Sequence, residues 1–343
     1  MHASAPYLYL GVDIVNLPLI SRRLVLVSSL AVAGLMSACS DSSSTASSTS
    51  IDVFPSKGRF SDGAVVKAYN PLTGAELGSG TTSSGSAKLN LGSHTGPFVL
   101  KVLGGTGVTF YNEADGSSVA FGATDSMLSV VPTVTANASY GVTPLTNMAA
   151  QIAGVGADLK ITGASATAIA DTVKTAIATT QLAIGVSATE FNITSAPVAI
   201  NASNKITASS SASAAKYAMV LASLATAYGA NAKNMIGELA TAGSTYKTTP
   251  ASGITLPTTL TSAASVFSGG KVVIPASVTT NNVAAGVTAP TVTTVAPVLT
   301  QAAITSAVAT EIAKVEASLP TAPAATGTGT GTGTGSTGLS AVK

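Results

Sequence analysis

The spacing of the hydrophobic residues changes near residue 139, and this change constrains the fold more than any other feature of the chain. From Ile51 to about Ala138, apolar and polar residues alternate, and turn-forming residues interrupt the pattern at short intervals. From Thr143 onward, apolar residues recur every three or four positions. The first pattern is typical of short β-strands and the second of amphipathic helices. We therefore expect an α+β protein whose strands precede its helices.

Several strands can be placed within the alternating region. Ala87, Leu89 and Leu91 share one face of a predicted strand, and residues 63–70 and 98–103 show similar patterns. Two further runs, 108–112 and 118–121, flank Asp115-Gly116 and predict a hairpin. Short strands at this spacing favour an antiparallel β-sandwich. Most aromatic residues beyond position 38 lie in or beside this region, so we expect the main core here.

The helical region begins with a recognisable start signal. Thr143 is suited to cap a helix, and Pro144 is suited to be its first residue. Alanine-rich amphipathic stripes follow, and we expect them to pack together as a small bundle. Their apolar positions are Leu145, Met148, Ala149, Ile152 and Val155; Ile169, Val173 and Ile177; Tyr217, Val220, Leu221, Leu224 and Tyr228; Met235, Ile236 and Leu239; and Ile304, Val308, Ile312, Val315 and Leu319.

The composition of the remaining segments sets the expected domain organisation. Residues 39–50 are rich in Ser and Thr and predict a flexible tether, and residues 320–343 form a Thr/Gly-rich tail that we expect to be disordered. Between them we expect a sandwich domain over 51–138 and a helical domain over 139–319. Residues 248–300 interrupt the helical domain with irregular sequence and a weak strand signal at 271–274.

The single cysteine closes an N-terminal segment that is typical of export signals. Arg22 and Arg23 precede an apolar run over 24–35, and small residues lead to Cys39. We therefore interpret residues 1–38 as a signal peptide. Two alternatives are a buried structural cysteine and an uncleaved membrane helix. The apolar run is too short to span a bilayer, so the second of these is disfavoured.

The residues just before Cys39 resemble a lipoprotein motif. The run Leu35-Met36-Ser37-Ala38-Cys39 is similar to the lipobox of bacterial lipoproteins, although Met36 stands where that family most often has Leu. The resemblance implies cleavage before Cys39 and acylation of its thiol and its freed amine. Several acyl chains would then hold the protein on a membrane, because each buried methylene contributes about 0.8 kcal/mol. Ser40 follows the cysteine, which in that family favours the outer membrane.

The alternating region resembles the carboxypeptidase regulatory-like, or prealbumin-like, family of small sandwich domains. The likeness is carried by Gly63 with Val65 and Val66, the 70–74 turn, the strand entry at 85–91, and the run 96–104. It covers roughly a quarter of the chain. It implies a structural or binding role and no chemistry of its own. An immunoglobulin-like sandwich is an alternative interpretation of the same pattern.

Charge excludes one class of partner. The chain has 16 basic and 14 acidic residues, and only Arg22, Arg23 and Asp13 of these fall in residues 1–38. The remainder is close to neutral, whereas nucleic-acid binding requires a basic patch. We expect no nucleic-acid partner. The expected partners are the membrane, through the lipid anchor, and an envelope polymer or protein.

The sequence contains no recognisable set of catalytic residues. His94 is the only histidine beyond residue 2, so neither a multi-histidine metal site nor a Cys/His pair can be assembled. Glu113, Asp115 and Asp125 lie around the predicted hairpin, but their spacing differs from that of a calcium loop. A polar turn is the more economical interpretation. We therefore predict no catalytic, metal-binding or cofactor-binding residue, and Cys39 is the one predicted modification site.

Three functional hypotheses follow from these observations. The leading one is a lipid-anchored, exported bacterial protein of the cell envelope that acts as a non-enzymatic binding or structural module. The second is a component of an extracellular filament, sheath or biofilm matrix, because the chain is only 9% charged and rich in small residues. The third is an envelope glycan hydrolase of unrecognised type that uses Glu113, Asp115 or Asp125.

Overall fold

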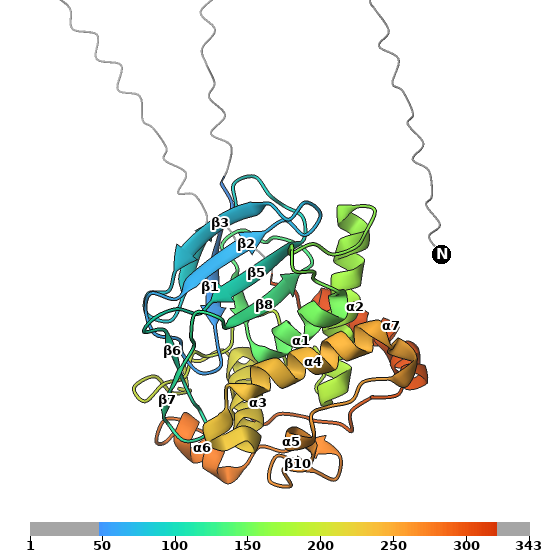
Figure 1. Cartoon of the computed structure of the whole chain (residues 1–343). Coiled ribbons are helices and arrows are strands. Elements are labelled where there is room, and N and C mark those ends of the chain that lie inside the picture. The colour runs from blue at the N-terminus through green and yellow to red at the C-terminus, as the bar shows by residue number, and fades with distance from the viewer. Residues whose placement is uncertain (1–47, 321–343) are drawn as a thin grey trace, which may run out of the picture. The chain divides into compact units, whose positions relative to one another are not determined.

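The computed structural model describes residues 48–320, and these residues form the expected mixture of strands and helices (Figure 1). The α+β prediction is confirmed. The predicted signal peptide, Cys39, most of the 39–50 tether and the tail beyond Pro320 lie outside the described residues. The strands of the first half are β1 (Ser50–Pro55), β2 (Val65–Tyr69), β3 (Glu76–Thr81), β4 (Ala87–Asn90), β5 (Phe98–Leu103), β6 (Thr109–Tyr111), β7 (Ser118–Ala120), β8 (Ser126–Val131) and β9 (Ser139–Val142). The helices are α1 (Pro144–Ala153), α2 (Ala166–Ile184), α3 (Ala212–Tyr228), α4 (Asn234–Thr248), α5 (Thr258–Thr261), α6 (Ala276–Asn282) and α7 (Gln301–Ala317).

Two main sheets organise the strands. One sheet has the order β4-β1-β9 and the other has the order β3-β2-β5-β8. All pairs in the second sheet are antiparallel, and β1 is antiparallel to β4. However, β1 and β9 pair in parallel, which the alternating pattern did not predict. The first strand of the region is thus paired with the last one before the helices.

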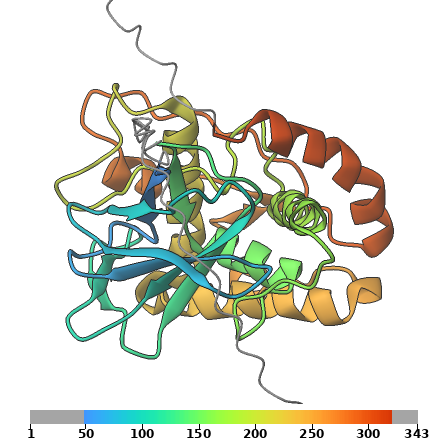
Figure 2. The ribbon, with the colours of Figure 1, turned by 90° about the horizontal axis from the view of Figure 1, so that it is seen from above.

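Two strands of the four-stranded sheet, β5 and β8, are buried on both faces. Leu100 of β5 and Met127 of β8 belong to a hydrophobic cluster that also includes Ile51 and Leu89 of the other sheet. Their neighbours on the opposite face, such as Val99, belong instead to a cluster with the helices. This double burial explains why residues 98–103 and 127–131 are almost continuously apolar. The sheets and the helices therefore form successive layers (Figure 2).

The strand predictions with clear local signals are confirmed. Residues 87–90 and 98–103 form β4 and β5, and residues 65–69 form β2. The predicted hairpin is present as the antiparallel pair β6 and β7. Gly116 lies in its turn with a φ of 78°, a left-handed conformation that glycine adopts without strain.

The start of the first helix is also as predicted. The Thr143 side chain accepts a hydrogen bond from the Thr146 backbone (3.2 Å), and the Thr146 hydroxyl accepts one from the Thr143 backbone (2.8 Å). This is a reciprocal capping arrangement, and Pro144 occupies the first helical position. The Thr143 hydroxyl also lies 2.6 Å from the buried Tyr217 hydroxyl of α3, so the cap joins two helices.

The largest buried cluster lies between the four-stranded sheet and the helices. It includes Leu145 of α1, Ile177 of α2, Leu221 of α3, Leu239 of α4 and Val315 of α7. The expectation that the aromatic-rich strand region holds the main core is therefore wrong. The cluster against the helices contains more buried residues than the cluster between the two sheets, and most of its members are aliphatic residues and alanines. The described strands and helices form one compact unit that shares this cluster.

The segment that the sequence left unassigned contains only short elements. After α4 come α5, the two-residue strands β10 (Phe267–Ser268) and β11 (Lys271–Val272), and α6. The strand signal at 271–274 thus corresponds to β11. None of the helices within residues 48–320 is both long and apolar enough to cross a membrane.

Candidate functional site

A lysine and a glutamate are buried near each other at the end of β1. Lys57 follows β1 and lies in a turn, and Glu113 lies in the turn between β6 and β7. Lys57 is 0% exposed and Glu113 is 1% exposed. The Lys57 ammonium nitrogen lies 5.8 Å from the centroid of the Phe110 ring. Charged residues are rarely buried to this degree unless they are paired, so the pair is the most unusual polar feature of the described chain.

Burial shifts the ionisation of both groups toward neutrality. It lowers the pKa of Lys57 to about 8, and the negative charge of Glu113 opposes this shift. It raises the pKa of Glu113 to about 7, and the positive charge of Lys57 opposes that shift. Among the described residues, neither the Lys57 ammonium nor either carboxylate oxygen of Glu113 has a hydrogen-bond partner. The charged and neutral forms of the pair are therefore close in free energy near neutral pH.

Backbone geometry fixes the turn that carries Lys57. Gly58 has a φ of 72°, and a Cβ atom at this position would lie 1.9 Å from the Tyr111 carbonyl oxygen. Only glycine allows the strand to pass so close to β6. The end of β1 is thus held against the hairpin that supplies Glu113.

Two buried amides hold the Glu113 turn against the helices. Asn112 donates a hydrogen bond through Nδ2 to the Gly229 carbonyl at the end of α3 (2.9 Å). Asn282 of α6 donates through Nδ2 to the Glu113 carbonyl (3.2 Å). The pair therefore lies where β1, the hairpin, α3 and α6 converge. Because neither ionisable side chain reaches solvent, the pair cannot contact a substrate in this conformation.

The acidic residues that the sequence singled out do not form one site. Asp115 accepts hydrogen bonds from the Ser117 backbone (2.9 Å) and hydroxyl (2.6 Å), as expected for a polar turn. Asp125 accepts from the Gly122 backbone (2.7 Å) and forms an ion pair with Lys233 (2.7 Å). Between residues 48 and 320, no three His, Cys, Asp or Glu side chains are placed to hold a metal ion.

His94 lies in the loop before β5. Its Nε2 atom is 2.9 Å from the Pro97 carbonyl oxygen, to which it donates when that nitrogen carries the proton. Cys39, the predicted lipidation site, lies outside the described residues.

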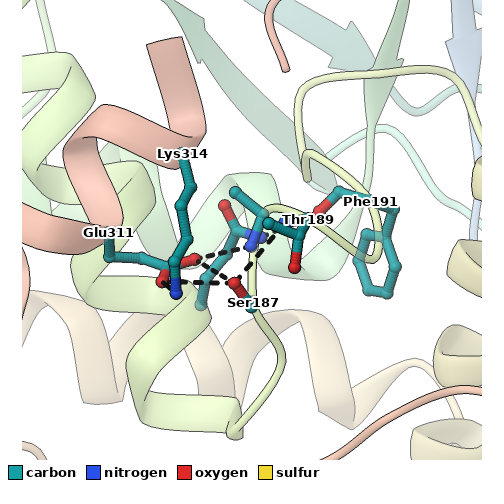
Figure 3. Close-up of polar contacts among 7 residues, drawn as sticks. Ser187, Thr189, Phe191, Glu311 and Lys314 are labelled. Carbon is teal, nitrogen blue, oxygen red and sulfur yellow. Dashed lines mark hydrogen bonds and ion pairs between the residues drawn. The ribbon is translucent and has the colours of Figure 1, made fainter. Parts of the chain in front are cut away.

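A second buried carboxylate joins the last helix to the loop after α2. Glu311 of α7 is 3% exposed, and it accepts a hydrogen bond from the Ala188 backbone. The Ser187 hydroxyl donates to the same carboxylate (3.1 Å), and the Lys314 ammonium lies 3.0 Å from it (Figure 3). The carboxylate therefore satisfies polar groups of a turn that follows α2. We interpret this contact as structural, because the buried carboxylate is occupied by the Ser187 hydroxyl, the Ala188 backbone and Lys314.

Replacing Glu311 by alanine should lower the free energy of unfolding by about 2 kcal/mol, because buried donors at Ser187 and Ala188 lose their acceptor. Urea denaturation of the purified chain measures this change. Glu316→Ala is the matched control, since Glu316 lies on the same helix and pairs with Lys174 (2.8 Å) at the surface. Equal effects of the two substitutions would contradict the structural role of Glu311.

The described surface also contains open cavities. One has a volume of about 750 Å³ and lies between α4 and residues 255–259, with Glu238, Thr241 and Leu256 in its lining. A second cavity of about 400 Å³ is lined by polar groups that include Arg59 and Tyr111. Both volumes fall within the range of small-molecule sites. However, neither contains the buried Lys57–Glu113 pair.

The sequence patterns were not used to predict that Lys57 and Glu311 are buried, although each residue has a local signal for burial. Lys57 continues the alternation of Ile51, Val53 and Pro55, so the pattern places it on the inward face. Glu311 lies three positions after Val308 and four before Val315, so it falls on the apolar stripe of α7. In both cases, a charged residue occupies a position that the hydrophobic spacing assigns to a buried face, and this mismatch is the signal that identifies it.

Comparison with known proteins assigns the chain to no family. No family model, curated protein or solved structure matches it.

Proposed function

We propose that this chain is an exported bacterial lipoprotein, anchored through Cys39, whose folded part is a non-enzymatic binding or structural module of the cell envelope. The run from Leu35 to Cys39, with its resemblance to a lipobox, carries this proposal. The arrangement of the folded part is compatible with it. β1 begins at Ser50, so only a short segment separates the cysteine from the first strand.

We also propose that the two main sheets form a sandwich of the prealbumin-like or immunoglobulin-like type. Inward residues of both sheets share one buried cluster, to which β1 contributes Val53 and β2 contributes Val66. Such a sandwich would serve as a rigid platform that displays loops to an envelope polymer or protein. It would require no bound cofactor.

Substitution of Cys39 tests the anchor directly. We expect the wild-type protein in the outer-membrane fraction and Cys39→Ala outside every membrane fraction, because the variant has no thiol to acylate. Ser40→Ala is the matched control, since it changes the next residue and keeps the thiol. Metabolic labelling with a palmitate analogue should mark the wild type and Ser40→Ala, but not Cys39→Ala.

Protease treatment of intact cells then separates the two possible orientations. Digestion of the wild type would place the module on the cell surface, and protection until the envelope is opened would place it in the periplasm. Membrane association of Cys39→Ala equal to that of the wild type would overturn the lipoprotein proposal.

A further inference from the structure

The cavity of about 400 Å³ lies on a small three-stranded patch at the β6–β7 hairpin, which is labelled in Figure 1. Residues 59–61 run along one side of β6, where the Tyr111 backbone donates a hydrogen bond to the Arg59 carbonyl (3.0 Å). β7 runs along the other side of β6 and places Ser118 opposite Tyr111. Arg59, Tyr111 and Ser118 therefore form a row across the three segments.

The alternation of side chains directs this row away from the core. Phe60 and Phe110 are 0% and 1% exposed, and both belong to the cluster between the two main sheets. Because successive side chains of a strand point to opposite faces, the residues next to these phenylalanines point outward. Ser118 is exposed, and Arg59 and Tyr111 are half-buried. We call this outward face of residues 59–61, β6 and β7 the hairpin face.

Two glycines allow the long side chains of the row to lie against the backbone. A Cβ atom at Gly85 would lie 3.0 Å from Cγ of Arg59, and one at Gly116 would lie 3.3 Å from the Tyr111 hydroxyl. Each of these side chains therefore occupies space that a larger neighbour would fill. The hairpin face remains open above them.

The row keeps hydrogen-bonding groups that the fold does not use. Among the described residues, the Tyr111 and Ser118 hydroxyls form no hydrogen bond, although both residues line the cavity. The Arg59 guanidinium lies 3.8 Å from the Asp62 carboxylate, which is too long for a hydrogen bond. Its N–H donors are therefore available to a ligand.

The loop over residues 200–204 adds an amide to the same cavity. The Ile200 carbonyl accepts a hydrogen bond from the Arg59 backbone (2.7 Å), which fixes the loop beside the row. The Asn201 Oδ1 atom accepts from the backbones of Ser203 (2.8 Å) and Asn204 (2.6 Å). These contacts orient the Asn201 carboxamide and leave its two N–H donors without an acceptor among the described residues.

The charges on the cavity lining cancel. Arg59 is the cation and Asp62 is the anion among the residues that line it. An anionic ligand would be repelled by Asp62 and a cationic ligand by Arg59, so charge complementarity favours a neutral ligand. That ligand must also donate and accept hydrogen bonds, because guanidinium and amide N–H groups donate and the carboxylate accepts.

We propose that the hairpin face binds a neutral sugar, and that the partner of this chain is a neutral glycan of the envelope or of the matrix around it. Each sugar hydroxyl both donates and accepts, which matches the mixed groups of the cavity. A pyranose ring with equatorial hydroxyls presents C–H groups that pack on an aromatic ring, and Tyr111 supplies that ring. This inference rests on the proposed envelope function and names the class of polymer that the module binds.

Calorimetric titration tests the proposal with two neutral probes of this kind, cellohexaose and N-acetylchitohexaose. The protein is the chain without residues 1–38, carrying Cys39→Ala. We expect at least one probe to bind, and Tyr111→Leu to weaken binding about tenfold or more, because the variant keeps an apolar side chain and loses the flat ring. Tyr246→Leu is the matched control, since Tyr246 is also half-buried but lines a different cavity on α4.

A second variant keeps the test decisive if Tyr111→Leu does not fold. Ser118→Gln changes an exposed residue and places a larger side chain over the cavity, so it should weaken binding to a similar degree. Failure of both probes to bind at millimolar concentration would overturn the proposal. Full binding by Tyr111→Leu and Ser118→Gln would also overturn it, because the sugar would then bind elsewhere.

A protein partner gives a different result. A photo-crosslinking amino acid at Ser118 that captures an envelope protein in cells, without binding of either oligosaccharide, would assign the hairpin face to that protein and overturn the proposal. The titration does not depend on the lipid anchor. Failure of palmitate labelling would therefore overturn the proposed function alone, and loss of sugar binding with normal labelling would overturn this inference alone.

Discussion

Replacing Lys57 by methionine should lower the free energy of unfolding by about 3 kcal/mol at pH 7.5, because the buried Glu113 carboxylate loses the cation that opposes its burial. The reverse substitution, Glu113→Leu, should have a similar effect, since it leaves a buried ammonium group without its counter-charge. Urea denaturation of the chain without residues 1–38, carrying Cys39→Ala, provides the measurement.

A double variant distinguishes the effect of losing the whole pair from the effect of losing one partner. Lys57→Met combined with Glu113→Leu removes both charges and keeps similar volumes in the core. Replacing a buried ion pair by apolar residues is often neutral or stabilising. We therefore expect the double variant to be at least as stable as the wild type, so that the two single effects are strongly non-additive.

A surface pair supplies the matched control. Lys67 and Glu76 also form a Lys–Glu contact between two strand regions (2.8 Å), but both side chains are about one-third exposed. Exposed ion pairs contribute little to stability, so Lys67→Met should have only a small effect. If Lys57→Met proved as mild as Lys67→Met, or if the double variant were as unstable as the two single effects added together, the buried pair would not behave as described.

Elements with a local signal were predictable from the sequence. The β6–β7 hairpin has turn residues between two alternating runs, and α1 has a capping residue and a proline at its start. These signals involve only residues a few positions apart, so they do not depend on how distant parts of the chain pack. The helical stripes of α2, α3, α4 and α7 were predictable for the same reason, because each is defined by the spacing of its own apolar residues.

Long-range pairing was not predictable in this way. The parallel pairing of β1 with β9 brings Asp52 opposite Ser139, at the two ends of the strand region, so the residues of neither strand alone indicate it. The contact between Glu311 and Ala188 joins positions 123 residues apart. Glu113 was recognised as an acidic residue of a turn, but its burial depends on Lys57, Asn282 and the end of α3. The sequence pattern alone does not bring these groups together.

The buried pair should also leave a minimum in the pH dependence of stability between about pH 7 and 8. The pKa of Glu113 is about 7 in the folded chain, above its usual value. Between that usual value and pH 7, the folded state holds a proton that the unfolded state has lost, so stability falls as the pH rises. The pKa of Lys57 is about 8 when folded, below its usual value. Above pH 8, the unfolded state holds the extra proton, so stability rises again with pH.

The depth of this minimum is measured best as a difference between two proteins. Other carboxylates, such as Asp158 and Glu190, have lowered pKa values and cause a separate loss of stability in acid. The Lys57→Met/Glu113→Leu variant keeps those groups and lacks the pair, so subtracting its profile from that of the wild type isolates the pair. Each arm of the difference should approach about 3 kcal/mol, because a pKa unit corresponds to 1.36 kcal/mol. A difference profile that is flat from pH 5 to 10 would mean that the pair ionises as it does in water. In that case the lysine and the glutamate must reach solvent in the folded protein, and the convergence of β1, the hairpin and α6 must open far more readily than its packing implies.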